Sequence, residues 1–327
     1  MDKLSLITRN VDEIVTLDEL KALIESKNRP TAYVGYEPSG KIHMGHLLTV
    51  NKLVDLQNAG FDIIVLLADL HAYLNEKGEL EKIREMAQEN KRVFGALGLN
   101  PDKTTFVLGG SDERGFSEKD GFQMTPEYQM RWQKLMQHIP EKRAIRSMRL
   151  LARDPDNMKA SHIVYPILQV ADMLELGIDV AVGGMDQRKI HMLAREALPK
   201  LGFKAPVCIH TPILVGMDGA KMSSSMENYI SVDDSPEEVD QKLMNAFCPP
   251  RRVENNPVID IFKYHIFPKL AGVTIERDAK FGGDIHYRQF IELERDFISG
   301  AVHPLDAKKG AMKHINQILE PIRKVLS

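Results

Sequence analysis

Residues 33–46 read Tyr33-Val-Gly-Tyr-Glu-Pro-Ser-Gly-Lys-Ile-His-Met-Gly-His46, which predicts a strand, a tight turn and a helix in that order. The run from 32 to 36 is apolar, β-branched and aromatic, as in a buried parallel strand. Pro38 and its two successors break the chain, and a helical pattern of apolar residues begins at Ile42. Free amides and the helix dipole meet at a helix start, so this order of elements favours phosphate binding. We interpret the stretch as a nucleotide site.

Two histidines lie in the first turn of this helix. His43 and His46 are three residues apart, so both project from one face, and Gly45 between them would let a base approach bare backbone. The stretch is not a Walker loop, because Gly-x-x-x-x-Gly-Lys-Ser/Thr is absent. Two other interpretations of this motif stay open. One is a helix start with two half-exposed histidines, and the other is a zinc site with His71, although no third ligand has a usual spacing.

A second motif lies far downstream, where residues 216–225 read Gly216-Met-Asp-Gly-Ala-Lys-Met-Ser-Ser-Ser225. Its glycines predict a mobile loop, its lysine supplies a point charge, and its three hydroxyls supply small donors. Alone, the segment could be an ordinary surface loop. Together with His43 and His46, in this order, it resembles the paired HIGH and KMSKS signatures of class I aminoacyl-tRNA synthetases.

Composition sets limits on the class of protein. The chain has 327 residues, enough for a large α/β domain and a smaller second one, and its net charge of −3 argues against indiscriminate binding of polyanions. Cys208 and Cys248 show no paired spacing, which fits a reducing cytosol. Residues 1–13 have no signal-peptide core, and no apolar run approaches transmembrane length. We therefore expect a cytoplasmic protein with no membrane contact.

Strand and helix patterns alternate along the chain, which indicates an α/β fold with a doubly wound parallel sheet. Ligands of such sheets bind beyond the carboxyl ends of the strands, which is where Asp69 and His71 fall. The predicted strands are 32–36, 61–69, 104–108, 180–182 and 207–210, and residues 4–26 and 79–97 are predicted to be helical.

Helix 161–176 carries a polar stripe along an otherwise apolar surface. Tyr165, Gln169 and Asp172 follow each other at i, i+4 and i+7, so they share one face. A buried carboxylate without a partner is costly, which favours a pocket for a small polar ligand, although a solvent-facing stripe is the alternative. After the next strand, Asp186 and Gln187 lie at a helix mouth, where Asp186 could also be an ordinary helix cap.

A basic stripe is predicted between these elements. Residues 109–137 interrupt the alternation and are the least informative part of the chain. After them, arginines recur at helical spacing, which predicts either a solvated face or a contact with RNA phosphates or base edges. From about residue 232 the composition changes to a capped helix at Pro236 and further helices, which predicts a domain boundary. The arginines are Arg143, Arg146, Arg149 and Arg153.

Nearly the whole chain resembles the archaeal/eukaryotic-type tyrosyl-tRNA synthetases. The resemblance implies a Rossmann-type catalytic domain, residues 1–231, with a connective helical insertion at about 109–160 and a KMSSS loop at 216–226. It also implies a helical anticodon-binding domain, residues 232–327. The loop lacks the second lysine of the general KMSKS form, and no bacterial-type C-terminal RNA-binding appendage is discernible. The matching stretches are 33–46, 66–73, 165–172, 183–196, 221–225 and 303–306.

The activity implied by this resemblance is that of a tyrosine–tRNA ligase. ATP, with Mg²⁺, would activate L-tyrosine to tyrosyl-adenylate, and the tyrosyl group would then pass to tRNA(Tyr). Such enzymes are homodimers through the connective insertion. A tryptophanyl-tRNA synthetase is the nearest rival, but an indole offers one donor and leaves the hydroxyl of Tyr33 beside Asp172 with nothing to pair with. From another class, a catalytically silent RNA-binding relative is the alternative.

The resemblance also implies roles for individual residues, and it assigns none to a metal. Tyr33 and Asp172 would hold the phenol of tyrosine, and Tyr165, Gln169 and Gln187 its ammonium end, with Glu37 nearby. His43, Gly45, His46, Lys221, Met222, Ser223 and Ser224 would bind ATP, and the two histidines, the lysine and the two serines would be catalytic. Arg146 and Arg188 match positions that read the first base pair of the acceptor stem, and Phe281 and Asp306 match those that grip the first anticodon base.

Overall fold

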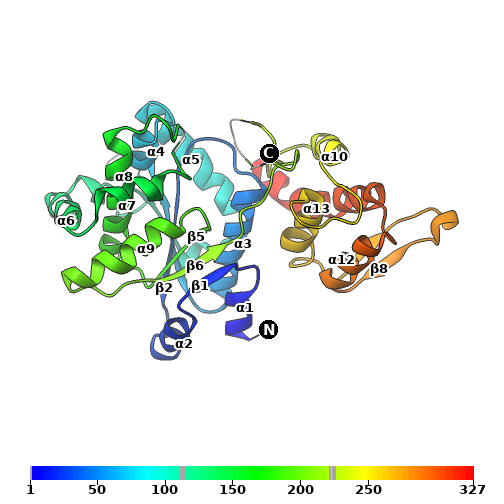
Figure 1. Cartoon of the computed structure of the whole chain (residues 1–327), viewed down its shortest axis with the longest axis horizontal. Coiled ribbons are helices and arrows are strands. Elements are labelled where there is room, and N and C mark those ends of the chain that lie inside the picture. The colour runs from blue at the N-terminus through cyan, green and yellow to red at the C-terminus, as the bar shows by residue number, and fades with distance from the viewer. Residues whose placement is uncertain (1, 111–114, 153, 221, 223–225) are drawn as a thin grey trace. The chain divides into compact units, whose positions relative to one another are not determined.

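The computed structural model describes residues 2–110, 115–152, 154–220, 222 and 226–327 (Figure 1). Contacts divide the chain into two compact units. The first holds the residues up to Gly40 together with Thr49–Ile213, and the second holds Lys41–Leu48 together with Leu214–Ser327. The short segment 41–48 belongs to the second unit because its backbone pairs with residues 230–232. The domain boundary near residue 232 remains a prediction.

The first unit is built on a six-stranded sheet in the order β1-β6-β5-β2-β3-β4. β1 is antiparallel to β6, and all the other pairs are parallel, which confirms the predicted α/β class. The strand order reverses between β2 and β5, so the carboxyl ends of these two strands mark the expected ligand crevice. The strands are β1 (Glu13–Val15), β2 (Thr31–Tyr36), β3 (Asp62–Leu67), β4 (Thr104–Leu108), β5 (Val180–Gly184) and β6 (Val207–Thr211).

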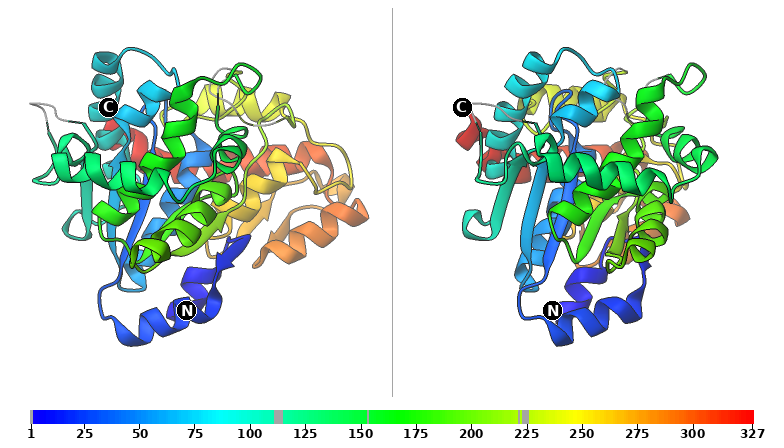
Figure 2. Two further views of the ribbon diagram at one scale, coloured as in Figure 1. Left: turned by 60° about the vertical axis from the view of Figure 1, so that its left-hand side comes forward. Right: turned by 90° about the vertical axis from the view of Figure 1, so that its left-hand side faces the viewer.

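Helices cover both faces of this sheet. On one face, α6 to α9 pack in a core that includes Tyr33, Leu66 and Tyr128, and Figure 2 shows these helices in green from two further sides. On the other face, Tyr36 of β2 stacks on Phe94 of α5, with ring centroids 4.6 Å apart. The helices are α1 (Lys3–Thr8), α2 (Leu17–Ser26), α3 (Met44–Asn58), α4 (Asp69–Leu74), α5 (Leu80–Ala96), α6 (Pro126–Met136), α7 (Glu141–Met148), α8 (Ala160–Glu175) and α9 (Arg188–Ala197).

Two local predictions differ from the structure. The helical lead-in predicted over 4–26, with a second helix starting at Asp18 and Glu19, matches α1 and α2 but misses the strand β1, which lies between them and pairs with β6. The strand predicted at 61–69 ends at Leu67, and Asp69 begins α4. There the Asp69 carboxylate accepts hydrogen bonds from the backbone N–H of Gly110 at 2.9 Å and from Arg84 Nε at 3.1 Å. Asp69 therefore anchors the end of β4 to α4 and α5.

The second unit is mainly helical, as predicted, and it also contains an antiparallel hairpin of β7 (Val273–Ile275) and β8 (Ile285–Tyr287). The predicted helix start is confirmed, since Ser235 and Glu238 form a capping box ahead of α10. Phe262, Phe297 and Leu319 are fully buried in its core. In the described ranges no helix combines the length and the apolar character needed to cross a membrane. The helices are α10 (Pro236–Asn245), α11 (Pro257–Ile261), α12 (Phe290–Ser299) and α13 (Pro304–Leu326).

Candidate active site

Asp172 is the buried end of the polar stripe on α8. One of its oxygens, Oδ1, accepts hydrogen bonds from Tyr128 Oη and from Gln123 Nε2, each at 2.7 Å. Its other oxygen, Oδ2, lies 3.4 Å from His71 Nε2 and has no hydrogen-bond partner among the described residues. Burial raises the pKa of Asp172 to about 7 and lowers that of His71 to about 4. The stripe is therefore buried, which excludes the solvent-facing interpretation.

Tyr33 supplies a hydroxyl to the same group of side chains. It is 1% exposed, and burial together with the charge of Asp172 raises its pKa well above the ordinary value. Its ring lies across the backbone of β2, because a Cβ atom added at Gly35 would come within 2.8 Å of the Tyr33 hydroxyl. Only glycine leaves room there. The phenol of Tyr33 is therefore neutral, and it lies close enough to Asp172 for the carboxylate charge to raise its pKa.

A second polar group lies around Glu37, directly after β2. Its carboxylate accepts hydrogen bonds from Tyr165 Oη at 2.8 Å and Asn75 Nδ2 at 2.9 Å, and Lys77 Nζ lies 3.7 Å away. Burial raises the pKa of Glu37, against the opposing effect of Lys77. An anionic group with hydrogen-bonding neighbours at this place can bind an ammonium.

An amide pair joins α8 to the start of α9. Gln169 Nε2 donates to Gln187 Oε1 at 3.0 Å. The backbone of Gly183 lies close to the side chain of Gln187, since a Cβ atom on Gly183 would lie 2.9 Å from Gln187 Cβ. Gln187 is the N-cap residue of α9 and its side chain makes no capping hydrogen bond, so Asp186 does not occupy the N-cap position suggested for it.

Four buried oxygens in these groups lack a hydrogen-bond partner within the described part of the chain: Asp172 Oδ2, Gln123 Oε1, Gln169 Oε1 and Asn75 Oδ1. Buried polar atoms are nearly always paired, and leaving one unpaired costs about 1–3 kcal/mol. When Asp172 is ionised, all four are acceptors, so the ligand that satisfies them must bring donors. A hydroxyl and an ammonium on one small molecule fit this requirement.

The histidine motif forms part of the second unit. Its backbone is tied to residues 230–232, because Met44 N donates to Ile230 O and Val232 N donates to Ile42 O, each at 3.0 Å. His43 Nδ1 accepts from Gly45 N at 3.1 Å, and His46 Nδ1 accepts from His43 N at 3.2 Å. The proton of each neutral ring therefore lies on Nε2, which can donate.

The electrostatics of the two histidines keep them neutral. Burial lowers the pKa of His43 to about 2 and that of His46 to about 4, and the two ring centroids are 3.9 Å apart. Neutral imidazoles offer hydrogen bonds but no charge. Both side chains have intermediate exposure and lie at the start of α3, so the interpretation as half-exposed histidines at a helix start stays open.

Gly45 and the start of the downstream loop lie in the same unit. A Cβ atom at Gly45 would lie 3.3 Å from the Sδ atom of Met222. Asp218 Oδ1 accepts hydrogen bonds from Ala220 N and Asn228 Nδ2, each at 2.9 Å, which holds the loop closed at its base. Lys221, Ser223 and Ser224 lie outside the described residues, so their roles remain predictions.

The residues predicted to contact RNA are distributed over both units. Arg146 is exposed on α7, which ends at Met148, so the predicted stripe leaves the helix at Arg149. Arg143 pairs with Glu196, whereas Arg153 lies outside the described residues. In the second unit, Phe281 is 62% exposed and Asp306 lies in the first turn of α13, whose cap is His303. Arg188, at the start of α9, is paired with Glu13.

Three of the residues in this buried polar cluster were not expected from the sequence. Gln123 and Tyr128 come from the segment 109–137, which had looked uninformative, and Asn75 follows α4. No periodic pattern marks them. The signal that could have pointed to them is indirect, since a buried carboxylate at Asp172 requires two donors from another element.

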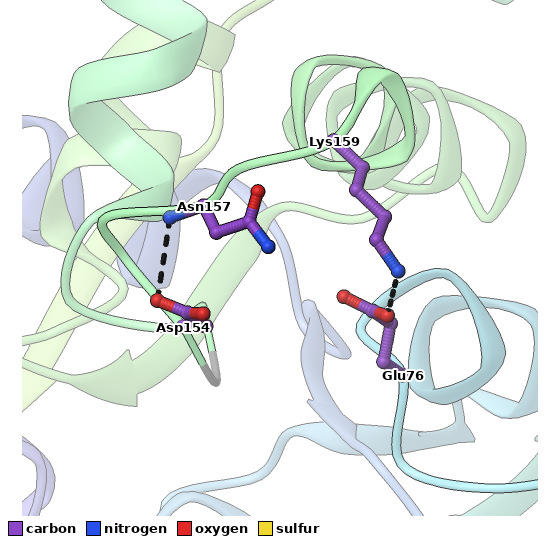
Figure 3. Close-up of a pocket in the computed structure, with 4 residues that line it drawn as sticks. All are labelled: Glu76, Asp154, Asn157 and Lys159. Atoms are coloured by element: carbon purple, nitrogen blue, oxygen red, sulfur yellow. Dashed lines mark hydrogen bonds and ion pairs between the residues drawn. The ribbon is translucent and has the colours of Figure 1, made fainter.

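A polar pocket of about 550 Å³ in the first unit is lined by Glu76, Asp154, Asn157 and Lys159 (Figure 3). Glu76 and Lys159 point toward one another across it and form an ion pair, and Asn157 N donates to Asp154 Oδ1 at 3.3 Å. Glu76 follows Asn75, which bonds both to Glu37 and to Leu151 O. One residue that lines the pocket, Glu76, is thus the chain neighbour of a side chain that contacts Glu37.

The raised pKa of Asp172 predicts a pH dependence of stability. Its carboxyl titrates near pH 4 when unfolded, whereas the folded protein keeps the proton up to about pH 7. Its contribution to stability is therefore fully present below about pH 4 and falls as the pH rises to about 7. Asp172→Asn removes this titration. Denaturant unfolding of the ligand-free proteins should favour the variant increasingly from pH 4 to 7, by a few kcal/mol at most. A difference that does not change with pH would contradict the assignment.

Comparison with known proteins identifies the family. The model for tRNA synthetases class I (W and Y) matches residues 25–320. The tyrosine–tRNA ligase of Methanococcoides burtonii is 57% identical over 326 residues, covering 100% of both chains. The crystal structure of Archaeoglobus fulgidus tyrosyl-tRNA synthetase complexed with L-tyrosine matches with a TM-score of 0.93 and 55% identity over 99% of each chain. A tryptophanyl-tRNA synthetase from Aeropyrum pernix, at 22% identity, TM-score 0.73 and coverage of 94% and 81%, shares the fold alone. The chain therefore belongs to the class I tRNA synthetases, among the archaeal-type tyrosyl-tRNA synthetases.

Proposed function

We propose that this chain activates L-tyrosine with ATP to tyrosyl-adenylate and pyrophosphate, and then transfers the tyrosyl group to the 3′ end of tRNA(Tyr). The observation that carries this proposal is the set of four unpaired buried acceptors on Asp172, Gln123, Gln169 and Asn75. L-Tyrosine brings the donors that these atoms lack, a phenolic hydroxyl at one end and an ammonium at the other. The full-length identity with tyrosine–tRNA ligases supports the same assignment.

In this proposal the phenol of the substrate lies between Tyr33 and Asp172. Tyr33 donates to the phenolic oxygen, and the phenol donates to Asp172 Oδ2. Tyr128 and Gln123 hold the other carboxylate oxygen, so the carboxylate cannot turn away. The ammonium end binds among Tyr165, Gln169, Gln187 and Glu37 through the pairs described above. This leaves the carboxylate of tyrosine free to react.

The tyrosine carboxylate attacks the α-phosphorus of ATP, and the bond to pyrophosphate breaks. A carboxylate nucleophile needs no base, so the protein contributes positioning and stabilisation of charge as it moves onto pyrophosphate. His43 and His46 donate hydrogen bonds to phosphate oxygens from Nε2, and Gly45 admits the adenosine. Lys221, Met222, Ser223 and Ser224 complete the nucleotide site, with Lys221 supplying positive charge.

Mg²⁺ would enter with the phosphates of ATP, where it neutralises charge. Among the described residues no three His, Cys, Asp or Glu side chains gather as a site for a metal ion. This agrees with the usual behaviour of Mg²⁺, which is held largely by substrate phosphates and water. The zinc interpretation of His43, His46 and His71 finds no support in this donor set.

The proposal extends to tRNA and to a second copy of the chain. Arg146 and Arg188 would read the first acceptor base pair, and Phe281 and Asp306 the first anticodon base. Met124, Met130 and Met136, in and next to α6, are each about half exposed or more, as expected of the insertion through which a homodimer would form. We place the enzyme in the cytoplasm, where tRNA charging takes place.

The exchange of labelled pyrophosphate into ATP tests the activity directly. Exchange that requires tyrosine supports the proposal, exchange that requires tryptophan supports the rival enzyme, and no exchange with either amino acid supports a silent RNA-binding relative. Charging of tRNA(Tyr) transcript with labelled tyrosine then tests the second step.

Selectivity against phenylalanine should depend on Asp172. Phenylalanine leaves the polar groups of Tyr33 and Asp172 buried and unpaired. Asp172→Ala should reduce the tyrosine-over-phenylalanine ratio of kcat/KM in pyrophosphate exchange by roughly 5- to 150-fold, the worth of one such group. Glu175→Ala, one turn further along α8 in a partly exposed pair with Arg131, is the control and should keep the ratio. An unchanged ratio in Asp172→Ala would remove Asp172 from the pocket.

Lys221 should act mainly while pyrophosphate departs. Lys221→Ala should lower kcat for adenylate formation more than it raises the KM for tyrosine, because its ammonium meets charge that develops in the transition state. Lys221→Arg keeps the charge and should recover part of the rate. A loss confined to the KM for tyrosine, with kcat intact, would refute this role.

Asp306 should separate tRNA recognition from adenylate chemistry. Asp306→Ala should leave pyrophosphate exchange nearly unchanged, whereas aminoacylation should weaken through the KM for tRNA by about 1–3 kcal/mol if a direct base contact is lost. Phe281→Ala should behave similarly, because one stacked base is worth about 1–3 kcal/mol. Glu320→Ala, later on the same helix in a surface pair with Lys324, is the control.

A changed first anticodon base decides how Asp306 acts. The change should harm Asp306→Ala less than the parent, because the contact is already gone. If the loss of aminoacylation from Asp306→Ala and the loss from the changed base simply add, Asp306 does not read that base. It then serves only the start of α13, where a carboxylate contributes a few tenths of a kcal/mol to about 1 kcal/mol of stability.

A further inference from the structure

Glu13, on the edge strand β1, is held by three donors. Its carboxylate accepts hydrogen bonds from Arg188 Nε at 2.6 Å, Arg188 Nη2 at 2.8 Å and His210 Nδ1 at 2.9 Å. The arginine lies 175 positions away in the chain and the histidine 197. The register of β1 against β6 places Glu13 opposite His210, which explains how so short a strand can bring the carboxylate to this point.

From His210 the contacts extend into the core and reach α9, the helix that carries Arg188. His210 Nε2 lies 3.0 Å from Nδ1 of His191, and both rings are buried. Burial lowers the pKa of both, so both are neutral. A neutral His210 that donates to Glu13 from Nδ1 must accept at Nε2, so His191 is the donor there. His191 follows Arg188 by three residues on α9, so Glu13 is fixed through buried groups that do not depend on the arginine.

The contact engages only one edge of the Arg188 guanidinium. Nε and Nη2 face Glu13, and nothing in the described part of the chain pairs with Nη1. The side chain is 41% exposed. The outer edge, Nη1 and the second hydrogen of Nη2, therefore presents two parallel donors. This is the arrangement that binds O6 and N7 of a guanine, or two oxygens of a phosphate.

We propose that Glu13 is a positioning residue for recognition of the acceptor stem, which it serves by fixing the outer edge of Arg188 toward the first base pair. The inference rests on the proposed role of Arg188 in binding tRNA. A free arginine side chain would lose rotamer freedom on binding, whereas one held by Glu13 has lost it already. Glu13 would thus increase discrimination between acceptor base pairs without contacting the RNA itself.

The same helix offers a matched control. Arg195, two turns after Arg188, also pairs with a glutamate, Glu19 of α2. Arg195 is 17% exposed, and both of its Nη atoms are engaged, because Nη1 also donates to Pro206 O at 2.8 Å. It has no free outer edge. Glu19→Gln therefore weakens a comparable ion pair where no base can be read.

The test compares charging of two tRNA(Tyr) transcripts, one with the native first base pair and one with its two bases exchanged. Arg188→Ala should reduce the ratio of kcat/KM between them by roughly 5- to 150-fold, the worth of one bidentate base contact. Glu13→Gln should reduce it by at least about 5-fold, and the double variant should do little worse than Arg188→Ala. Glu19→Gln should keep the ratio, and both glutamate variants should keep tyrosine-dependent pyrophosphate exchange.

Exchange activity and thermal unfolding show whether each variant is folded. If Glu13→Gln does not fold, Glu13→Asp keeps the charge on a side chain one methylene shorter and should lower the ratio in the same direction. If Arg188→Ala loses discrimination while the folded Glu13 variants keep it, Glu13 is not a positioning residue, although Arg188 remains a tRNA contact. If Arg188→Ala itself keeps discrimination, the proposed contact fails, and the role of Glu13 fails with it.

Discussion

The candidate amino-acid site depends on a carboxylate, Asp172, that is buried with no lysine or arginine paired to it in the described residues. Its desolvation is offset by Tyr128 and Gln123, which approach from α6 and the segment before it and fix one oxygen. The same two hydrogen bonds attach that segment to α8. The same hydrogen bonds therefore pack this segment against α8 and orient the Asp172 oxygen that faces the ligand. A change that weakens the packing would also disturb the orientation of that oxygen.

The two ligands are matched by opposite hydrogen-bonding character. The amino-acid pocket presents unpaired acceptors, whereas the histidine motif presents Nε2 donors whose Nδ1 atoms are occupied by backbone N–H groups. A phosphate placed among the acceptors would meet oxygen against oxygen, and an ammonium placed at the histidines would meet donor against donor. At the histidines, burial maintains the neutral state that this selection needs.

Much of the fold and of the candidate site could be predicted from the sequence, and the features that could not be predicted share a cause. Strands β2 to β6 show local apolar patterns, and Tyr165, Gln169 and Asp172 show helical spacing, so both were predictable. β1 was not, because three residues carry no period and the strand exists only through its partner β6. Gln123 and Tyr128 were missed for the same reason, since their importance comes from a residue on another helix. The protonation of the histidines follows from burial, which periodicity does not measure.

The pairing of β1 with β6 has a consequence for how the protein is made. Glu13 and His210 are 197 residues apart, and a ribosome adds roughly 5–20 residues each second. The strand β1 therefore waits about 10–40 s after its own synthesis before its partner exists. Meanwhile β2, β3 and β4 already have one another as neighbours. The nascent chain must carry an unpaired N-terminal segment through most of translation. A strand of only three residues, one of them the charged Glu13, offers other strands few backbone groups to pair with.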